Sequence, residues 1–130
     1  MNTTKPFYSH EPDGRIMIKK DKAEVRNWTA DLEYVNEELE YLLDIEDSML
    51  NNPELYRQLR SLQRENQLKL GALYRYDGSM GNAIECDTTE CDAYYLHNHE
   101  KNRTIYTAHV HTYRELKKRV LSKILLNAKN

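Results

Sequence analysis

Four residues that could bind a metal ion lie close together in the second half of the chain. Cys86, Cys91, His97 and His99 form the pattern C-x4-C-x5-H-x-H, and thiolates and imidazoles are the ligands of tetrahedral zinc sites. The spacing does not suit a helix, because residues two apart lie about 200° apart around a helix axis. We therefore expect no metal at this cluster, and two reduced cysteines in a cytoplasmic protein.

A second set of polar residues is predicted to lie inside the fold. Counting residues back from the expected turns places His109 level with Asn66 and Asn36, and Asp77 level with His99. These side chains could form polar layers that fix the register of packed helices. Alternatively, Asn66, Asp77, His99 and His109 could form a small metal or ligand site, in which an Asp–His hydrogen bond orients the imidazole. We favour the first interpretation.

The sequence shows no pattern that is typical of an active site. It lacks the Glu-x-x-His pairs of di-iron helical bundles, a phosphate-binding glycine loop and a serine nucleophile motif. We therefore expect a protein without enzymatic activity and without a cofactor.

Tyrosine is unusually frequent, with 10 tyrosines against one phenylalanine and one tryptophan. A tyrosine ring offers contact area and a polar tip, which suits both the edges between helices and a surface that binds another protein. The first candidates for such an interaction surface are Tyr8, Tyr34, Tyr41 and Tyr56.

The elements that position these residues are predicted to be helices. From about Asp21 to Leu50, apolar residues recur every three or four positions, as in coiled-coil packing; the stripe comprises Val25, Trp28, Leu32, Val35, Leu39, Leu42 and Met49. Glu46 interrupts the stripe, and we expect its carboxylate to meet Arg119 or Arg57. A second stripe beside it indicates that the helix has two neighbours: Tyr34, Tyr41 and Ile45.

Two further helices follow. Asn52 and Pro53 suit the start of a helix, which could end near Asp77 because glycines are unfavourable in a helix interior. We favour continuation through Gly78 and Gly81 to Glu85, since the apolar period continues. The third helix is expected from about Thr89 to Asn127. Its last turns are apolar on most sides, which indicates contact with both neighbouring helices or with another subunit.

The first 19 residues are predicted to be non-helical. They contain Pro6, Pro12 and Gly14, and Pro12-Asp13-Gly14 is a turn signal. Residues 7–8 and 16–18 could pair as a short hairpin, or the segment could be a loose arm. We thus expect residues 1–19 as an arm and residues 20–130 as one helical domain.

Charge is distributed in blocks that support this topology. Residues 27–56 carry nine acids and no Lys or Arg, residues 57–76 carry five bases, and residues 101–129 carry eight bases. In an up-down-up bundle each block lies beside its opposite, and even weak ion pairs can select a register. Nucleic-acid binding through the basic third helix is a disfavoured alternative, because acids of the same chain lie nearby and the net charge is −2.

The sequence therefore predicts an all-α protein, an antiparallel up-down-up three-helix bundle with coiled-coil-like packing. No apolar run reaches the roughly 20 residues of a membrane span. The function we expect is that of an interaction or scaffold module, which associates with itself or with another protein.

Overall fold

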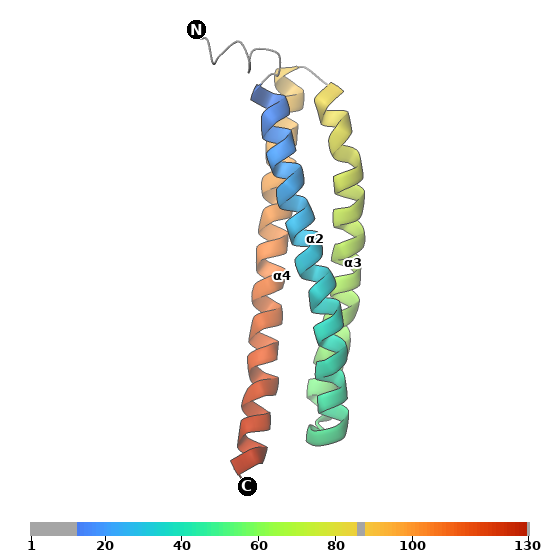
Figure 1. Cartoon of the computed structure of the whole chain (residues 1–130), viewed down its shortest axis with the longest axis vertical. Helices are drawn as coiled ribbons and strands as arrows, with labels where there is room; N and C mark the ends of the chain where they lie inside the picture. Colours follow the sequence, from blue (N-terminus) through green and yellow to red (C-terminus); the bar gives the residue numbers. More distant parts are fainter. Residues whose placement is uncertain (1–12, 86–87, 130) are drawn as a thin grey trace.

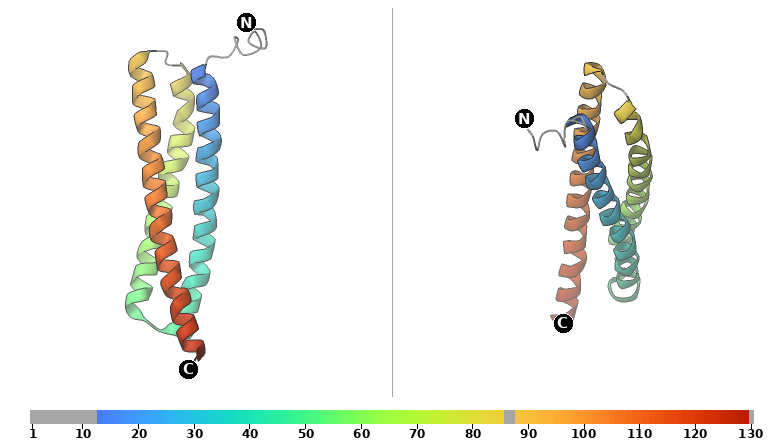
Figure 2. Two further views of the ribbon diagram at one scale, coloured as in Figure 1. Left: turned by 90° about the vertical axis from the view of Figure 1, so that its left-hand side faces the viewer. Right: turned by 45° about the horizontal axis from the view of Figure 1, so that its top comes forward.

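The computed structural model describes residues 13–85 and 88–129, which form three long helices lying side by side (Figure 1). Helix α2 (Asp13–Ile45) continues directly into a short π-helix, η1 (Glu46–Leu50), and is followed by α3 (Pro53–Glu85) and α4 (Thr89–Lys129). The start of α2, the end of α3 and the start of α4 lie at the same end of the molecule (Figure 2). This up-down-up order confirms the predicted three-helix bundle.

The core follows the predicted apolar stripes. In α2 it continues the period of seven from Ile18 through Val25 and Leu32 to Leu39, all buried. The core residues contributed by α3 and α4 are Leu55, Leu59, Leu62, Leu70, Leu73, Tyr76, Met80, Tyr95, Tyr113, Leu116 and Val120. A repeat of this length keeps one face of each helix toward its neighbours.

Helix α2 begins earlier than the sequence analysis predicted. It starts at Asp13, so residues 13–19 are helical, and the expected arm and hairpin are wrong for this segment. The physical reason is that Ile18 lies one heptad before Val25 and is buried in the core, which favours the helical period over strand pairing. Residues 1–12 lie outside the described residues, and so does Tyr8.

The turn between α2 and α3 explains the glutamate that interrupts the apolar stripe. Glu46 is buried, and its Oε2 accepts the backbone N–H of Asn52 at 2.7 Å. The expected pairing of Glu46 with Arg119 or Arg57 is therefore wrong, and Arg119 donates to Gln58 instead. The Asn52 side chain caps α3 by accepting the Leu55 N–H at 3.0 Å, as predicted.

Helix α3 continues through both of its late glycines to Glu85, as predicted. A β-carbon added at Gly78 or Gly81 would have no neighbour within 4 Å, so neither glycine is required by packing. Helix α4 begins at Thr89, and the hydroxyl of the preceding Thr88 accepts the N–H of Cys91. These ends agree with the predicted turns.

Tyrosines of α4 donate hydrogen bonds to carboxylates of α2 along the seam between the two helices. Tyr95 donates to Asp21 at 2.6 Å, and the same arrangement recurs for Tyr106 with Asp31 and for Tyr113 with Glu38. Burial and the neighbouring carboxylate raise the pKa of Tyr106 to about 12, and the same two causes raise the pKa values of Tyr95 and Tyr113. This repeated pair accounts for part of the tyrosine bias.

Ion pairs between helices agree with the charge blocks in part. Lys22 lies in the basic start of α2, and its Nζ is 3.3 Å from Asp77 Oδ1 of α3. Lys117 Nζ of α4 is 2.8 Å from Glu38 Oε1 of α2. Opposite blocks thus meet across two helix pairs, in the order that an up-down-up bundle requires.

Candidate functional site

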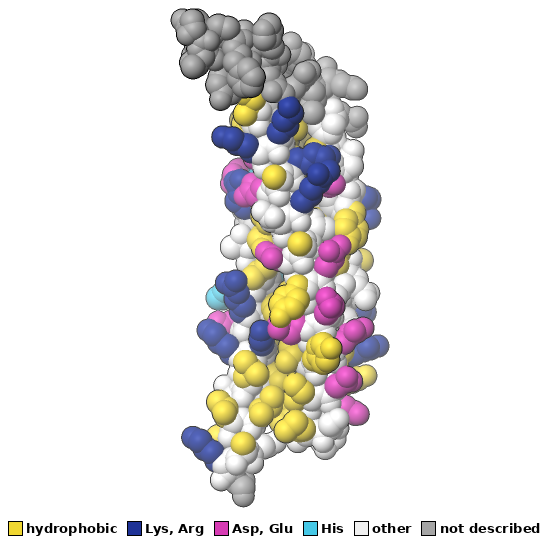
Figure 3. Space-filling model, viewed as in Figure 1, with side chains coloured by type: hydrophobic (Ala, Val, Ile, Leu, Met, Phe, Trp, Pro, Cys, Tyr) yellow, Lys and Arg dark blue, Asp and Glu magenta, His cyan; other side chains and the backbone are white. Residues whose placement is uncertain are grey.

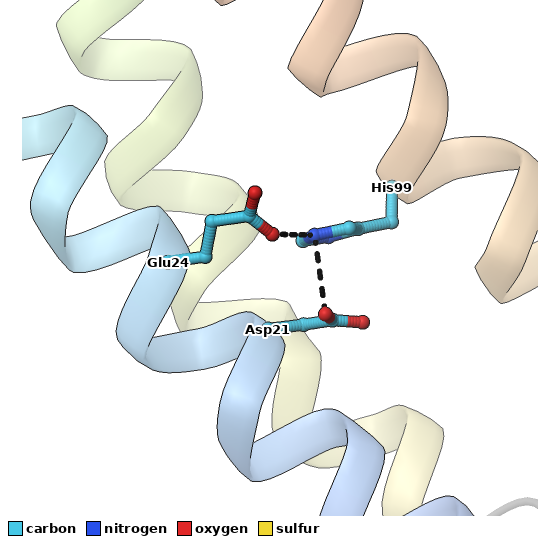
Figure 4. A group of neighbouring side chains, drawn as sticks. All are labelled: Asp21, Glu24 and His99. Atoms are coloured by element: carbon cyan, nitrogen blue, oxygen red, sulfur yellow. Dashed lines mark hydrogen bonds and ion pairs between the residues drawn. The ribbon is translucent and has the colours of Figure 1, made fainter.

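The most polar region of the bundle interior surrounds His99, which is only 3% exposed. Its Nδ1 lies 2.7 Å from the Tyr76 hydroxyl of α3. Its Nε2 lies 2.9 Å from Glu24 Oε1 and 3.5 Å from Asp21 Oδ1, both on α2 (Figure 4). The imidazole thus joins all three helices, with two carboxylates on one ring nitrogen and a phenol on the other.

Each carboxylate has a further partner that fixes its orientation. The Tyr95 hydroxyl donates to Asp21 Oδ2, which leaves Oδ1 as the oxygen nearest to His99. Arg103 donates from Nε to Glu24 Oε2 at 3.0 Å and from Nη2 to Oε1 at 2.8 Å. The Arg103 hydrogen bonds, and to a lesser extent the one from His99, lower the pKa of Glu24 against the effect of burial. Both acids are therefore held as oriented acceptors.

Aromatic rings enclose this group. The Trp28 ring stacks on His99 with 5.3 Å between centroids, and Tyr106 stacks on Trp28 at 5.2 Å. Burial is the main cause that raises the pKa of Tyr76 to about 12, so its hydroxyl keeps its proton over the physiological range. The surroundings exclude water from one side of His99 and leave the carboxylate side polar.

Such a group can bind a cation. Asp21, Glu24 and His99 offer ligand atoms that all lie within 4.8 Å of one another, and carboxylate oxygens and imidazole nitrogens are ligands of zinc and of other divalent transition metals.

The second polar group lies further along the bundle, where the sequence analysis placed it. The Asn66 amide nitrogen donates to the backbone carbonyl of Leu32 at 2.8 Å and to Asn36 Oδ1 at 2.7 Å. Asn66 Oδ1 accepts from His109 Nε2 at 2.8 Å. These partners come from all three helices, so the structure brings Asn66 and His109 together as one layer.

Asp77 does not hydrogen-bond His99. Its carboxylate lies near Lys22 and Arg26, whereas the residue before it, Tyr76, reaches the imidazole. Successive residues on a helix differ by about 100° in direction. The prediction placed the correct turn of α3 beside His99, but the side chain that contacts the histidine is that of Tyr76 and not that of Asp77.

The two histidines of the C-x4-C-x5-H-x-H pattern lie on different sides of α4. His97 is exposed and His99 is buried, as expected for residues two apart on a helix. Cys91 is disulfide-bonded, so the expectation of reduced thiols is wrong at this position. A disulfide sulfur is not the thiolate that binds zinc. The other cysteine, Cys86, lies outside the described residues.

Apolar side chains are exposed on one face of the bundle, over the halves of α2 and α4 farthest from their starts (Figure 3). Tyr34 and Tyr41 of α2 are 62% and 70% exposed, and Leu125 of α4 is 64% exposed. We call this surface the α2–α4 face and define it by Tyr34, Tyr41, Met49, Leu121 and Leu125. The two tyrosines of the predicted second stripe of α2 are thus largely exposed to solvent. Met49, which was predicted to belong to the first apolar stripe, is exposed and lies outside the core.

The two sides of the α2–α4 face carry opposite charge (Figure 3). On the side toward α3, the exposed Glu40, Asp44 and Asp47 of α2 line a shallow depression of about 500 Å³. That depression also contains Tyr56, so this fourth predicted contact residue lies beside the face rather than on it. On the other side, basic side chains gather over α4 (Figure 3), whose exposed bases in this half include Arg114 and Lys118.

Asp21 and Glu24 were not among the predicted site residues. A signal was available, since Asp21 falls between Ile18 and Val25 in the period of the core stripe. A carboxylate at a core position requires a buried partner. Which partner it has depends on where α4 lies, and the sequence does not give that to within one residue.

No family model, curated protein or solved structure matches this chain. Within the described ranges 13–85 and 88–129, no helix is long and apolar enough to cross a membrane.

Proposed function

We propose that this chain is a non-enzymatic helical interaction module that associates with a second copy of itself through the α2–α4 face. The observation that carries the proposal is the uncovered apolar face with acids on one side and bases on the other.

The exposed residues are too large and too close together to be scattered surface apolar groups. Tyr41 and Leu125 each expose more than half of their side chains, while Ile45 and Ile124 beside them are half-buried against the core. Contiguous exposed apolar surface on a folded protein is typical of a protein-binding site. Tyrosine and leucine side chains on such a surface gain free energy when a partner removes them from water.

The charges favour a second copy and one orientation of it. Consider two copies that face each other through the α2–α4 face and are related by a two-fold axis parallel to the helices. The acidic side of the face on each copy then lies opposite the basic side of the face on the other copy. A two-fold axis across the bundle would place like charges together. Two-fold interfaces are self-complementary by symmetry, and complementary charge selects orientation and partner. We therefore propose a parallel dimer.

The oligomeric state of the full chain tests this proposal. Sedimentation equilibrium is expected to give a dimer, and Tyr41→Ser and Leu125→Ser are each expected to weaken it by about tenfold or more, since truncation of an anchor residue of an interface costs about 2 kcal/mol or more. The matched controls Leu68→Ser and Tyr94→Ser remove equally exposed side chains elsewhere and should leave the dimer intact. A monomeric wild type at high micromolar concentration would overturn the proposal.

A charge exchange tests the orientation. Asp44→Lys or Lys118→Glu alone should weaken the dimer, because each places like charges across the proposed interface. The double variant restores opposite signs and should recover most of the loss. If the double variant is weaker than either single one, the parallel arrangement is wrong, even if the dimer itself exists.

A further inference from the structure

We propose that Asp21, Glu24 and His99 form a binding site for one divalent transition-metal ion of the Zn²⁺ type, held between α2 and α4. This inference does not depend on the dimer, because the site and the α2–α4 face share no residue.

The distances suit a tetrahedral ion. Metal–ligand distances of about 2.0–2.1 Å place the ligand atoms of such an ion about 3.3 Å apart. His99 Nε2 lies 2.9 Å from Glu24 Oε1 and 3.5 Å from Asp21 Oδ1, and all three ligand atoms fall within 4.8 Å of one another. Small movements of two carboxylates would therefore bring three ligands to tetrahedral separations, with the fourth position free for water.

The partners of the three ligands form an independent argument. Each ligand also forms a hydrogen bond through an atom other than its proposed metal-binding atom. These bonds join His99 Nδ1 to the Tyr76 hydroxyl, Asp21 Oδ2 to the Tyr95 hydroxyl and Glu24 Oε2 to Arg103 Nε. Metal sites in proteins orient their histidines and carboxylates through such hydrogen bonds, which improve affinity. In this structure His99 Nε2–H donates to the Glu24 carboxylate, and Nδ1 accepts from the Tyr76 hydroxyl. Metal binding would move the ring proton to Nδ1, where it would donate to the Tyr76 oxygen, and the Nε2 lone pair would then be available to the ion.

The charge of the group favours a cation. Asp21 and Glu24 contribute two negative charges and Arg103 one positive charge, so with neutral His99 the group keeps a net negative charge. Arg103 holds Glu24 Oε2 through Nε, and a bound ion would displace only its Nη2 contact with Oε1. The ion would then replace the hydrogen bond between His99 and Glu24, which is one of the links between α4 and α2.

Titration with Zn²⁺ tests the site. The full chain with His97→Ala and His111→Ala, which removes two exposed histidines, is expected to bind one Zn²⁺ by calorimetry and to unfold at a higher temperature with it. Asp21→Asn should weaken binding by about tenfold or more. The matched control Asp31→Asn removes a carboxylate of the same helix that also accepts from a tyrosine, and it should bind as the parent does.

Two further measurements separate a metal site from a merely structural group. Tyr76→Phe should weaken Zn²⁺ binding by about tenfold, because the imidazole loses the partner that orients it. Co²⁺ should give the visible absorption of a tetrahedral complex and change the fluorescence of Trp28, which stacks on His99. Absence of saturable Zn²⁺ binding, or equal binding by Asp21→Asn and Asp31→Asn, would overturn the proposal. If Asp21→Asn does not fold, an octahedral Co²⁺ spectrum of the parent would overturn it equally.

Discussion

The side chains of Asn66 and His109 form one buried hydrogen bond, 2.8 Å from His109 Nε2 to Asn66 Oδ1, in the bundle interior. Because the Asn66 oxygen can only accept, His109 Nε2 carries the hydrogen. The amide nitrogen of Asn66 is used at the same time by Leu32 and Asn36. A shift of any helix by one turn would leave these groups unpaired, so the layer selects a single register.

Replacing Asn66 by alanine is expected to lower the free energy of unfolding by about 2–3 kcal/mol, because the buried His109 and the half-buried Asn36 each lose a partner. The double variant Asn66→Leu with His109→Leu removes both polar partners and should be less destabilised than Asn66→Ala. Urea unfolding followed by circular dichroism measures both. A change below about 0.5 kcal/mol for Asn66→Ala, as for an ordinary surface substitution, would contradict the role of the layer.

Acid is expected to weaken the fold through His109. Burial is the main cause that lowers the pKa of His109 in the folded chain, and the charge of Lys69 lowers it further, against the opposing effect of Glu65. The unfolded chain therefore binds a proton at a higher pH, near about 6.5, than the folded chain does. Stability should thus fall as the pH drops from about 6.5 toward the lower folded pKa, and it should not change through this residue above that range.

Unfolding free energies between about pH 5 and pH 8 measure this effect. His109→Gln should reduce the dependence on pH, while His111→Gln, which replaces an exposed histidine of the same helix, should leave it as in the wild type. Equal slopes for both variants would show that another group is responsible.

Glu46 is expected to stabilise the turn between α2 and α3. Its carboxylate is buried and accepts the Asn52 N–H where Asn51 adopts a left-handed conformation (φ 49°). Glu46→Ala should cost about 1.5–3 kcal/mol, the value of a hydrogen bond to a charged group. Glu46→Gln keeps an acceptor and should cost less. The neighbouring exposed residue gives the control, since Asp47→Ala should change thermal unfolding little.

Two glycines of α3 are expected to be sites of easy stabilisation. Gly78→Ala and Gly81→Ala should each raise stability by about 0.5–1 kcal/mol, because alanine has less freedom to lose on folding and its methyl group meets nothing within 4 Å. Ala72→Gly on the same helix, at an exposed position, should lower stability by a similar amount. Thermal melts measure all three, and destabilisation by either alanine would show that the glycine has a role beyond the helix.

The sequence by itself determined the helices and their order. The seven-residue period of the apolar stripe, the asparagine and proline at the first turn, and the blocks of charge are local or additive signals, so they can be interpreted without coordinates. The sequence also predicted that Asn66 and His109 lie at the same height in the bundle, because short turns fix how far along each antiparallel helix a residue lies.

Only the tertiary structure decided which side chains meet. The sequence placed Asp77 level with His99, but Tyr76 makes the contact, since one residue around a helix changes the direction of a side chain by about 100°. The grouping of Asp21 and Glu24 with His99 depends on how α4 lies against α2, 75 or more residues away in the chain. The exposure of Tyr41 likewise depends on packing, because an apolar stripe is the same in sequence whether or not a neighbour covers it.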